Sequence, residues 1–265
     1  MQKIISKQGG EMPKSTLITI LLLLVAYPFM YQSENLNAEE LTLTASQILE
    51  KVDDVINAPK DQDLKIKLVL IDKEGKEKIR EMSMLQKGSD KRMVKFLSPA
   101  DQRGIAFLSL PGDIMYLYLP AFKKVRRIAS HVKNTKFAGT DFTYEDMEAK
   151  RYLEKWLPEL IKKEDSHYIL QLNPKEGVKT DYSKLIMWVR TDNFYPTKIE
   201  HYDKGNKPYK VMVREKIEKV KEYWISKQSE MEDLKEKHKT KMLLEDVKFD
   251  SELSDEFFTE RYLSR

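Results

Sequence analysis

The chain has 265 residues, of which 47 are Lys or Arg and 43 are Asp or Glu, so its formal net charge at pH 7 is +4. This balance argues against a nucleic-acid-binding protein whose affinity comes from neutralising phosphates. The absence of cysteine excludes a disulfide framework, a thiolate nucleophile, a cysteine-ligated zinc site and a lipid anchored on cysteine.

The first 38 residues have the pattern of a secretory signal peptide. Three lysines precede an apolar run of 14 residues from Leu17 to Met30, and the small residue Ala38 closes the polar stretch that follows. As a helix the run reaches about 21 Å, short of the roughly 30 Å hydrocarbon core of a membrane. We therefore predict a signal peptide over residues 1–38, export to the periplasm, and one domain over residues 39–265. The alternative is an uncleaved inner-membrane anchor.

An amphipathic helix is predicted at the start of the domain. Thr44 and Gln47 have the spacing of a capping box, in which each side chain accepts a hydrogen bond from the backbone N–H of the other residue. Apolar residues follow at helical spacing as far as Ile56, and Asn57-Ala58-Pro59 ends the helix.

The apolar period then changes to two, which predicts antiparallel strands joined by short turns. In the first strand Leu64, Ile66, Leu68 and Leu70 share one face. Further strands are expected over 78–86, 91–97, 104–110, 114–119, 166–172, 184–191, 196–203, 209–217, 221–234 and 237–250. A second helix is expected after Ser254, near the end of the chain.

The segment from Arg151 to Lys163 is ambiguous. Its apolar spacing suits a helix, whereas Pro158 favours a broken or bulged strand, which we prefer.

These elements predict a β-rich α+β fold, with a single large curved antiparallel sheet (a half-barrel of about ten strands) wrapped over a few helices. Open sheets of this size tend to curl, and so few helices would leave an apolar hollow. The alternative is an ordinary filled core. Ten side chains are candidates for the lining of the hollow: Met82, Met84, Met93, Phe107, Met115, Leu117, Leu119, Leu185, Met187 and Val189.

The most specific pattern in the chain runs from Met115 to Met147. An apolar strand ends at Leu119-Pro120, a basic run follows from Lys124 to Arg127, and Gly139 to Asp146 reads Gly-Thr-Asp-Phe-Thr-Tyr-Glu-Asp. This pattern resembles the outer-membrane lipoprotein-sorting protein family, which has the LolA-like fold, and in particular its branch associated with RND-type (resistance-nodulation-division) exporters.

The resemblance implies a periplasmic carrier or chaperone that binds lipid or lipoprotein acyl chains in an apolar cavity. Such a carrier transfers them between membranes, meets the membrane surface transiently, and works with an RND-type exporter. Two alternatives share the fold: a periplasmic sensor or adaptor that signals through a protein partner, and an exporter accessory that carries no lipid.

Four cations follow Pro120, at Lys123, Lys124, Arg126 and Arg127. One interpretation is that they contact a phosphate headgroup or an acidic partner at the cavity mouth. The alternatives are that they pair with Asp141, Glu145 and Asp146, or form a solvated strand face.

The Gly139-Thr140-Asp141 sequence is typical of a tight loop. We predict that Asp141 caps a short helix beginning at Phe142. Phe137, Phe142 and Tyr144 are expected to close one end of the hollow.

No sequence motif of a hydrolase, a phosphate-binding loop or a metalloprotease is present, so we predict neither an enzyme nor a cofactor. The best metal or base candidate is His201, beside Glu200 and with Asp203 on the same strand face. A plain surface histidine is the simpler interpretation.

Overall fold

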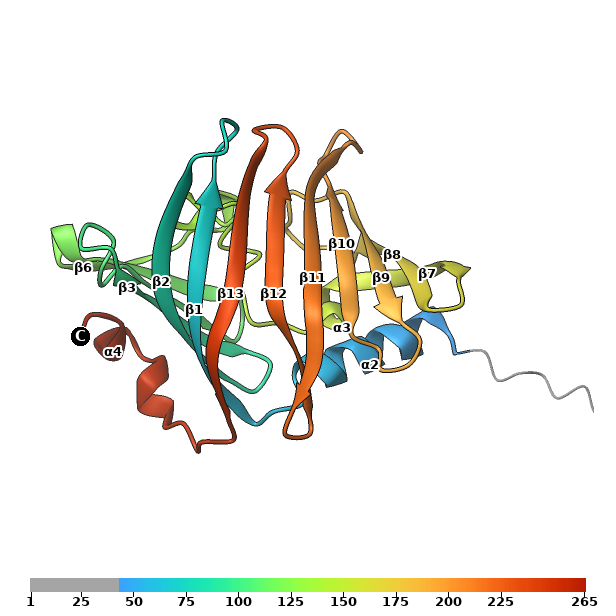
Figure 1. Cartoon of the computed structure of the whole chain (residues 1–265), viewed down its shortest axis with the longest axis horizontal. Coiled ribbons are helices and arrows are strands. Elements are labelled where there is room, and N and C mark those ends of the chain that lie inside the picture. Colours follow the sequence, from blue (N-terminus) through green and yellow to red (C-terminus); the bar gives the residue numbers. More distant parts are fainter. Residues whose placement is uncertain (1–42) are drawn as a thin grey trace, which may run out of the picture. The chain divides into compact units, whose positions relative to one another are not determined.

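Thirteen antiparallel strands form a single sheet in the computed structural model, which describes residues 43–265 (Figure 1). The predicted signal peptide lies outside the described residues. The strands are β1 (Asp61–Ile71), β2 (Glu77–Lys87), β3 (Lys91–Ser98), β4 (Ala106–Leu110), β5 (Ile114–Leu119), β6 (Lys124–Arg127), β7 (Trp156–Lys163), β8 (His167–Pro174), β9 (Lys184–Arg190), β10 (Pro196–Tyr202), β11 (Pro208–Val220), β12 (Tyr223–Asp233) and β13 (His238–Phe249).

The helices within residues 43–265 are few and short. They are α2 (Ala45–Ile56), α3 (Tyr152–Lys155), α4 (Glu260–Leu263), and the 3-10 helices η2 (Pro120–Phe122), η3 (Ser130–Val132), η4 (Phe137–Gly139) and η5 (Asp255–Phe258). None of these helices is long and apolar enough to cross a membrane. The predicted fold class is confirmed, with thirteen strands where about ten were expected.

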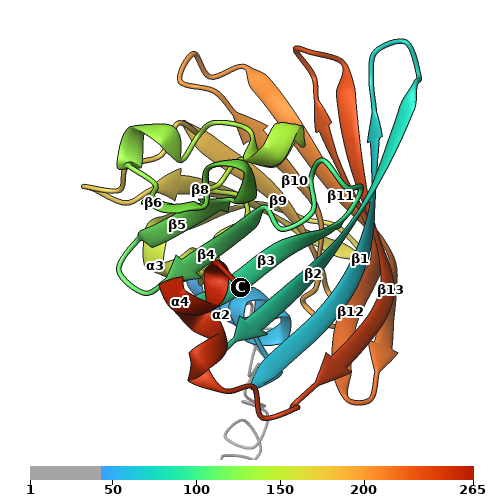
Figure 2. The same ribbon diagram turned by 90° about the vertical axis from the view of Figure 1, so that its left-hand side faces the viewer.

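The sheet consists of two meanders joined where β1 pairs with β13. One meander runs outward from β1 to the edge strand β6, and the other runs from the opposite edge strand β7 back to β13. The connection over residues 128–151 therefore links the two edges of the sheet, and Figure 2 shows the sheet curled around it and α2. Non-neighbouring parts of the sequence thus share one concave face.

Part of the concave face is filled by the connecting segment 128–151. Phe137, Phe142 and Tyr144 are buried there against Phe96 and Phe107, with ring centroids of Phe137 and Phe107 5.6 Å apart. The predicted inner face of the first strand, Leu64 to Leu70 at alternate positions, belongs to the same cluster. The aromatic residues of this segment therefore pack in the core on the concave face, and their closing one end of the hollow stays a prediction.

The other part is covered by α2, which begins with the predicted capping box. The Thr44 side chain accepts from the Gln47 N–H at 3.2 Å, and the Gln47 side chain accepts from the Thr44 N–H at 2.9 Å. Ile48, Leu49 and Val52 are fully buried against strands β8 to β10. At about 1.5–3 kcal/mol for each buried side chain, this stripe fixes the helix to the sheet.

The C-terminal helices cover the convex face of β3 to β5. Phe258 and Leu263 pack there with Met93, Ala106 and Leu108. These strands are therefore buried on both faces, and the prediction that Met93 lines the hollow is wrong. Its parity places it on the opposite face from Arg92 and Val94, and that face is apolar because η5 and α4 lie on it.

The segment Arg151–Lys163 combines both patterns that its sequence suggested. One helical turn, α3, leads directly into β7, whose pairing with β8 shifts register between Leu160 and Lys162. Pro158 is accommodated because β7 is an edge strand and pairs on one side only.

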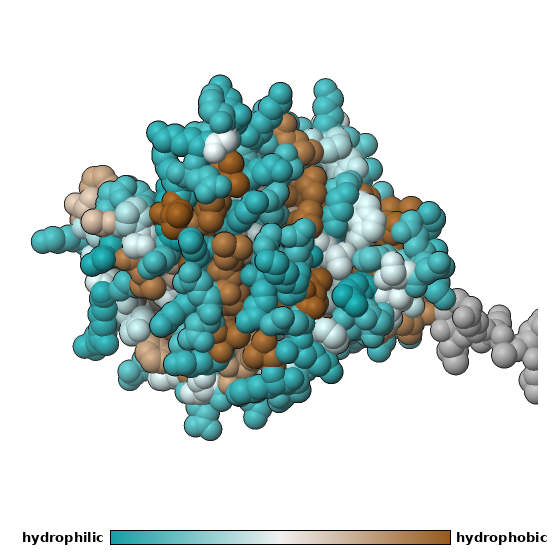
Figure 3. Space-filling model, viewed as in Figure 1, coloured by the Kyte–Doolittle hydropathy of each residue, from teal (hydrophilic) through white to brown (hydrophobic). Residues whose placement is uncertain are grey.

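The convex face of the central strands is mixed, with hydrophilic side chains interspersed among apolar ones (Figure 3). Lys239 bridges Glu230 and Glu232 at 3.2 and 3.3 Å, and Lys241 also contacts Glu230. Such partly exposed pairs contribute little each but keep this face hydrated.

Candidate functional site

A hollow of about 190 Å³ remains on the concave face, where β1, β2, β12 and β13 face the C-terminal end of α2. Its apolar wall is formed mainly by Leu64, Ile66, Met84, Ile225, Met242 and Leu244. The polar residues Arg92, Tyr195 and Arg214 line the same hollow and form its polar wall. The hollow is therefore amphipathic, whereas the sequence predicted a uniformly apolar one.

Two smaller hollows adjoin it, of about 140 and 50 Å³. Arg214 lines all three, and Asp146, Lys150 and Tyr152 line both of the smaller ones. They extend the open space from the apolar wall into a charged region beneath α2 and residues 145–152.

An ion pair buried in this region joins the connecting segment to β11. The Lys210 side chain is 0% exposed, and its Nζ lies 3.3 Å from Asp146 Oδ2. The Tyr182 hydroxyl donates to Asp146 Oδ1 at 2.9 Å. Burial by itself raises the pKa of Asp146, but the positive charge of Lys210, together with the Thr143 N–H and other neighbouring groups, outweighs it and holds that pKa below its ordinary value.

His201 is buried beside this pair, so the interpretation of a surface histidine is wrong. Its ring centroid is 4.8 Å from that of Tyr182, and burial lowers its pKa to about 4. Asp203 lies beyond the end of β10 and pairs with Lys235 at 2.6 Å. Residues 43–265 contain no cluster of three or more His, Asp or Glu side chains suited to a metal ion.

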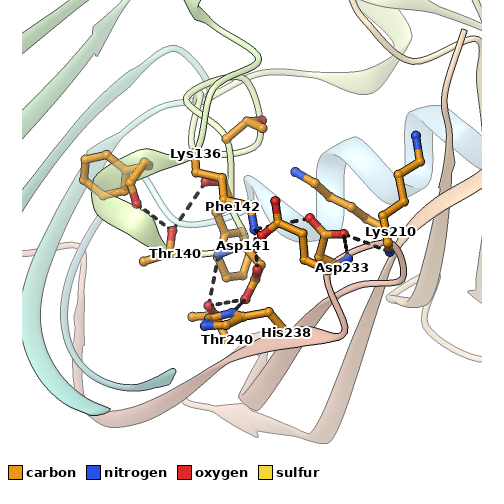
Figure 4. Close-up of polar contacts among 12 residues, drawn as sticks. Lys136, Thr140, Asp141, Phe142, Lys210, Asp233, His238 and Thr240 are labelled. Carbon is orange, nitrogen blue, oxygen red and sulfur yellow. Dashed lines mark hydrogen bonds and ion pairs between the residues drawn. The ribbon is translucent and has the colours of Figure 1, made fainter. Parts of the chain in front are cut away.

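Asp141 anchors the connecting segment to β13 (Figure 4). Its fully buried carboxylate accepts from His238 Nδ1 at 2.6 Å and from Thr240 Oγ1 at 2.7 Å. Lys136 Nζ bridges Asp141 at 3.1 Å and Asp233 at 3.3 Å. Burial alone lowers the pKa of Lys136, but the surrounding carboxylates raise it above its ordinary value.

Asp141 is therefore not a helix N-cap, contrary to the sequence prediction. Residues 144–147 form a turn, and Thr143, which forms an isolated β-bridge with Lys136, exchanges with Asp146 the pair of hydrogen bonds typical of a cap. Gly139 has a φ of 73°, a backbone conformation that glycine adopts without strain. Phe142 and Tyr144 follow it into the interior.

The candidate lining residues divide among several environments. Met84 and Leu185 line the hollows. Met82, Phe107, Met115 and Leu117 pack in the core beneath the connecting segment, and Met187 and Val189 pack beneath α2. Leu119 is partly buried just before η2, and Met93 lies on the convex face.

Sequence reasoning missed most of the polar wall. Leu64 and Ile66 were placed on the inner face by parity, but nothing local indicated that Arg92 and Arg214 would meet there. Arg92 donates to the Gln86 side chain and to the carbonyls of Met147 and Glu148, and burial is the main cause that lowers its pKa to about 10. The local sequence provides no signal, since both strands carry other charged residues besides these arginines.

The four cations after Pro120 are exposed, on or next to the edge strand β6. They do not pair with Asp141, Glu145 or Asp146, whose neighbours are other groups, so that alternative is wrong. Phe122 is 61% exposed beside them, and the Arg126 guanidinium lies 5.7 Å from its ring centroid. An exposed aromatic ring thus stands within a basic surface, which we call the β6 patch (Phe122, Lys123, Lys124, Arg126 and Arg127).

A family model described only as "Uncharacterized protein" matches residues 88–265, more than half of the chain. The chain belongs to this family. No curated protein matches the sequence significantly.

Solved structures show the same fold. A DUF1329 family protein from Desulfovibrio piger is 26% identical, with a TM-score of 0.78 over 84% of this chain and 100% of that one. A putative outer membrane lipoprotein-sorting protein domain from Vibrio parahaemolyticus is 25% identical, with a TM-score of 0.73 over 82% and 98%. A LolA superfamily protein from Nitrosomonas europaea is 23% identical, with a TM-score of 0.71 over 83% and 100%. The sheet is LolA-like.

Proposed function

We propose that this protein is a periplasmic carrier that holds lipid or lipoprotein acyl chains in the hollow of its sheet and transfers them between membranes. The observation that carries the proposal is the hollow of about 190 Å³ that the apolar side chains of β1, β2, β12 and β13 leave on the concave face. The similarity to a putative lipoprotein-sorting domain supports it. The role of the candidate lining residues is part of the proposal.

The size of the hollow implies a mechanism. Its volume of about 190 Å³ is close to that of an engineered cavity of about 150 Å³ that binds benzene, so a long chain enters only if the wall parts. Met84 and Met242 are flexible and can repack around a chain. Each methylene contributes about 0.8 kcal/mol on burial, and the cost of opening the wall offsets part of this gain, which allows release.

The β6 patch is the proposed contact with lipid headgroups or an acidic partner. Cations attract anionic headgroups at about 1 kcal/mol each near a membrane surface, and an exposed phenyl ring can enter the interface. The proposed inner-membrane partner, an RND-type exporter, rests on the sequence resemblance alone.

The test of the carrier is extraction of the purified protein with organic solvent, followed by mass spectrometry of the extract. We expect acyl chains from the wild type and from Leu243→Trp, and few from Leu244→Trp. Leu244 lines the hollow, whereas Leu243 is the preceding residue of β13 and points to the opposite face, so the two variants are a matched pair. A wild-type protein that neither retains nor accepts acyl chains would leave the scaffold or sensor alternatives.

The β6 patch is tested by transfer of acyl cargo between vesicles. Arg126→Glu with Arg127→Glu is expected to slow transfer without lowering the amount bound or the melting temperature, because both side chains are exposed. Lys204→Glu with Lys207→Glu is the control, since it reverses two exposed charges in the β10–β11 turn. Equal transfer by both double variants would remove the role of the patch.

A further inference from the structure

The carboxylates around the hollows each have a cation of their own. Asp146 pairs with Lys210 at 3.3 Å, and Glu148 pairs with Lys155 at 2.8 Å. These two pairs leave three other cations that line the hollows: Lys150, whose Nζ donates to the Glu145 carbonyl at 3.1 Å, and the two arginines Arg92 and Arg214.

Neither arginine forms an ion pair within residues 43–265. The single hydrogen bond of the Arg214 guanidinium there runs from Nη1 to the Pro196 carbonyl at 3.2 Å. Arg92 donates only to neutral oxygens, those of the Gln86 side chain and of two backbone carbonyls. Both arginines line the hollows of about 190 and 140 Å³, so two like charges border the same space.

A further unused donor lies in the adjoining small hollow. Trp156 is 1% exposed, and its Nε1–H has no hydrogen-bond partner among the described residues. Its side chain and Arg214 line this hollow together. A buried N–H left unpaired costs about 1–3 kcal/mol, so the site gains by receiving an acceptor.

We propose that the hollow binds an anionic single-chain amphiphile, whose carboxylate or phosphate headgroup is held by Arg214 and Arg92 while its alkyl chain lies against Leu64, Ile66 and Leu244. Arginine suits this role because its planar fork of N–H donors matches the oxygens of either headgroup. The inference rests on the proposed function, since it requires that the apolar wall accept an alkyl chain, and it adds the chemical class of the cargo.

The test measures binding of dodecanoate, dodecyl phosphate and uncharged dodecanol to the purified full-length protein by titration calorimetry. The three ligands share one alkyl chain and differ in the headgroup. We expect at least one of the two anions to bind about 10-fold more tightly than the alcohol, which corresponds to about 1.4 kcal/mol. Comparison of the two anions shows whether the site takes a carboxylate or requires a phosphate.

Arg214→Gln is expected to reduce the preference for the anions over the alcohol, because Arg92 remains, and to leave the affinity for the alcohol unchanged. Arg103→Gln, an exposed arginine outside the hollow, is the control and should keep the preference. Arg214→Lys keeps the charge without the fork and should retain part of it.

Equal binding of all three ligands to the wild type, or a preference that is undiminished in Arg214→Gln, would overturn this inference while leaving the carrier intact. Binding of none of them would overturn the carrier as well. The comparison of ligands on the wild type decides the matter even if a variant folds poorly.

Discussion

Replacing Asp141 with asparagine should loosen the connecting segment and destabilise the protein by about 3 kcal/mol. The carboxylate is 0% exposed and accepts from His238, Thr240 and Lys136 at 2.6, 2.7 and 3.1 Å. Loss of one partner of a buried ion pair costs about 3–5 kcal/mol. The lower part of that range applies because Lys136 retains its ion pair with Asp233 at 3.3 Å, and because the asparagine side chain still offers one acceptor oxygen.

The assay is urea unfolding followed by tryptophan fluorescence, together with hydrogen exchange of the backbone over residues 135–147. Exchange there should accelerate more than exchange in β1 and β2, because Asp141 fixes this segment to β13. Asp181→Asn is the control, since Asp181 is exposed and such surface changes usually stay within about 0.5 kcal/mol. A change below about 1 kcal/mol in Asp141→Asn, with unaltered exchange, would refute the reasoning.

Two further predictions concern the buried titratable groups Lys210 and His201 beside the hollow. Lys210→Met should lower the free energy of unfolding by about 3–5 kcal/mol, because it leaves the buried Asp146 carboxylate without its cation. Combining it with Asp146→Asn should recover part of that loss, as measured by urea unfolding. A double variant less stable than Lys210→Met alone would contradict this. Burial lowers the pKa of His201 to about 4 from an ordinary 6.5, so between these values the unfolded chain binds a proton that the folded protein does not. Stability contributed by a neutral His201 is therefore lost as the pH falls from 6.5 to 4, and the destabilisation by His201→Asn should be smaller by about 2–3 kcal/mol at pH 4.5 than at pH 7. The same destabilisation at both pH values would show that His201 does not titrate in this way.

Local patterns predicted the elements because their causes are local. The alternation at Leu64, Ile66, Leu68 and Leu70 requires one buried face, and the Thr44–Gln47 capping box is complete within four residues. Antiparallel pairing of successive strands follows from short turns, which are also readable in the sequence.

The failures arise where a distant segment decides the environment. Met93 was assigned to the hollow, but it lies on the opposite face of the sheet, which the C-terminal helices bury. In the same way, Asp141 was predicted to cap the backbone of the residues that follow it. Its hydrogen-bond partners His238 and Thr240 lie about a hundred residues away in the sequence.

The sequence by itself determined which residues form strands, which side of most strands is apolar, and that the sheet is too wide for its helices. The tertiary structure alone decided what occupies the concave face. Because β1 pairs with β13, the two meanders close around one space and bring Arg92 and Arg214 to the same hollow. A local sequence pattern cannot predict that these two arginines lie together, since their proximity depends on the strand order and register of the whole sheet.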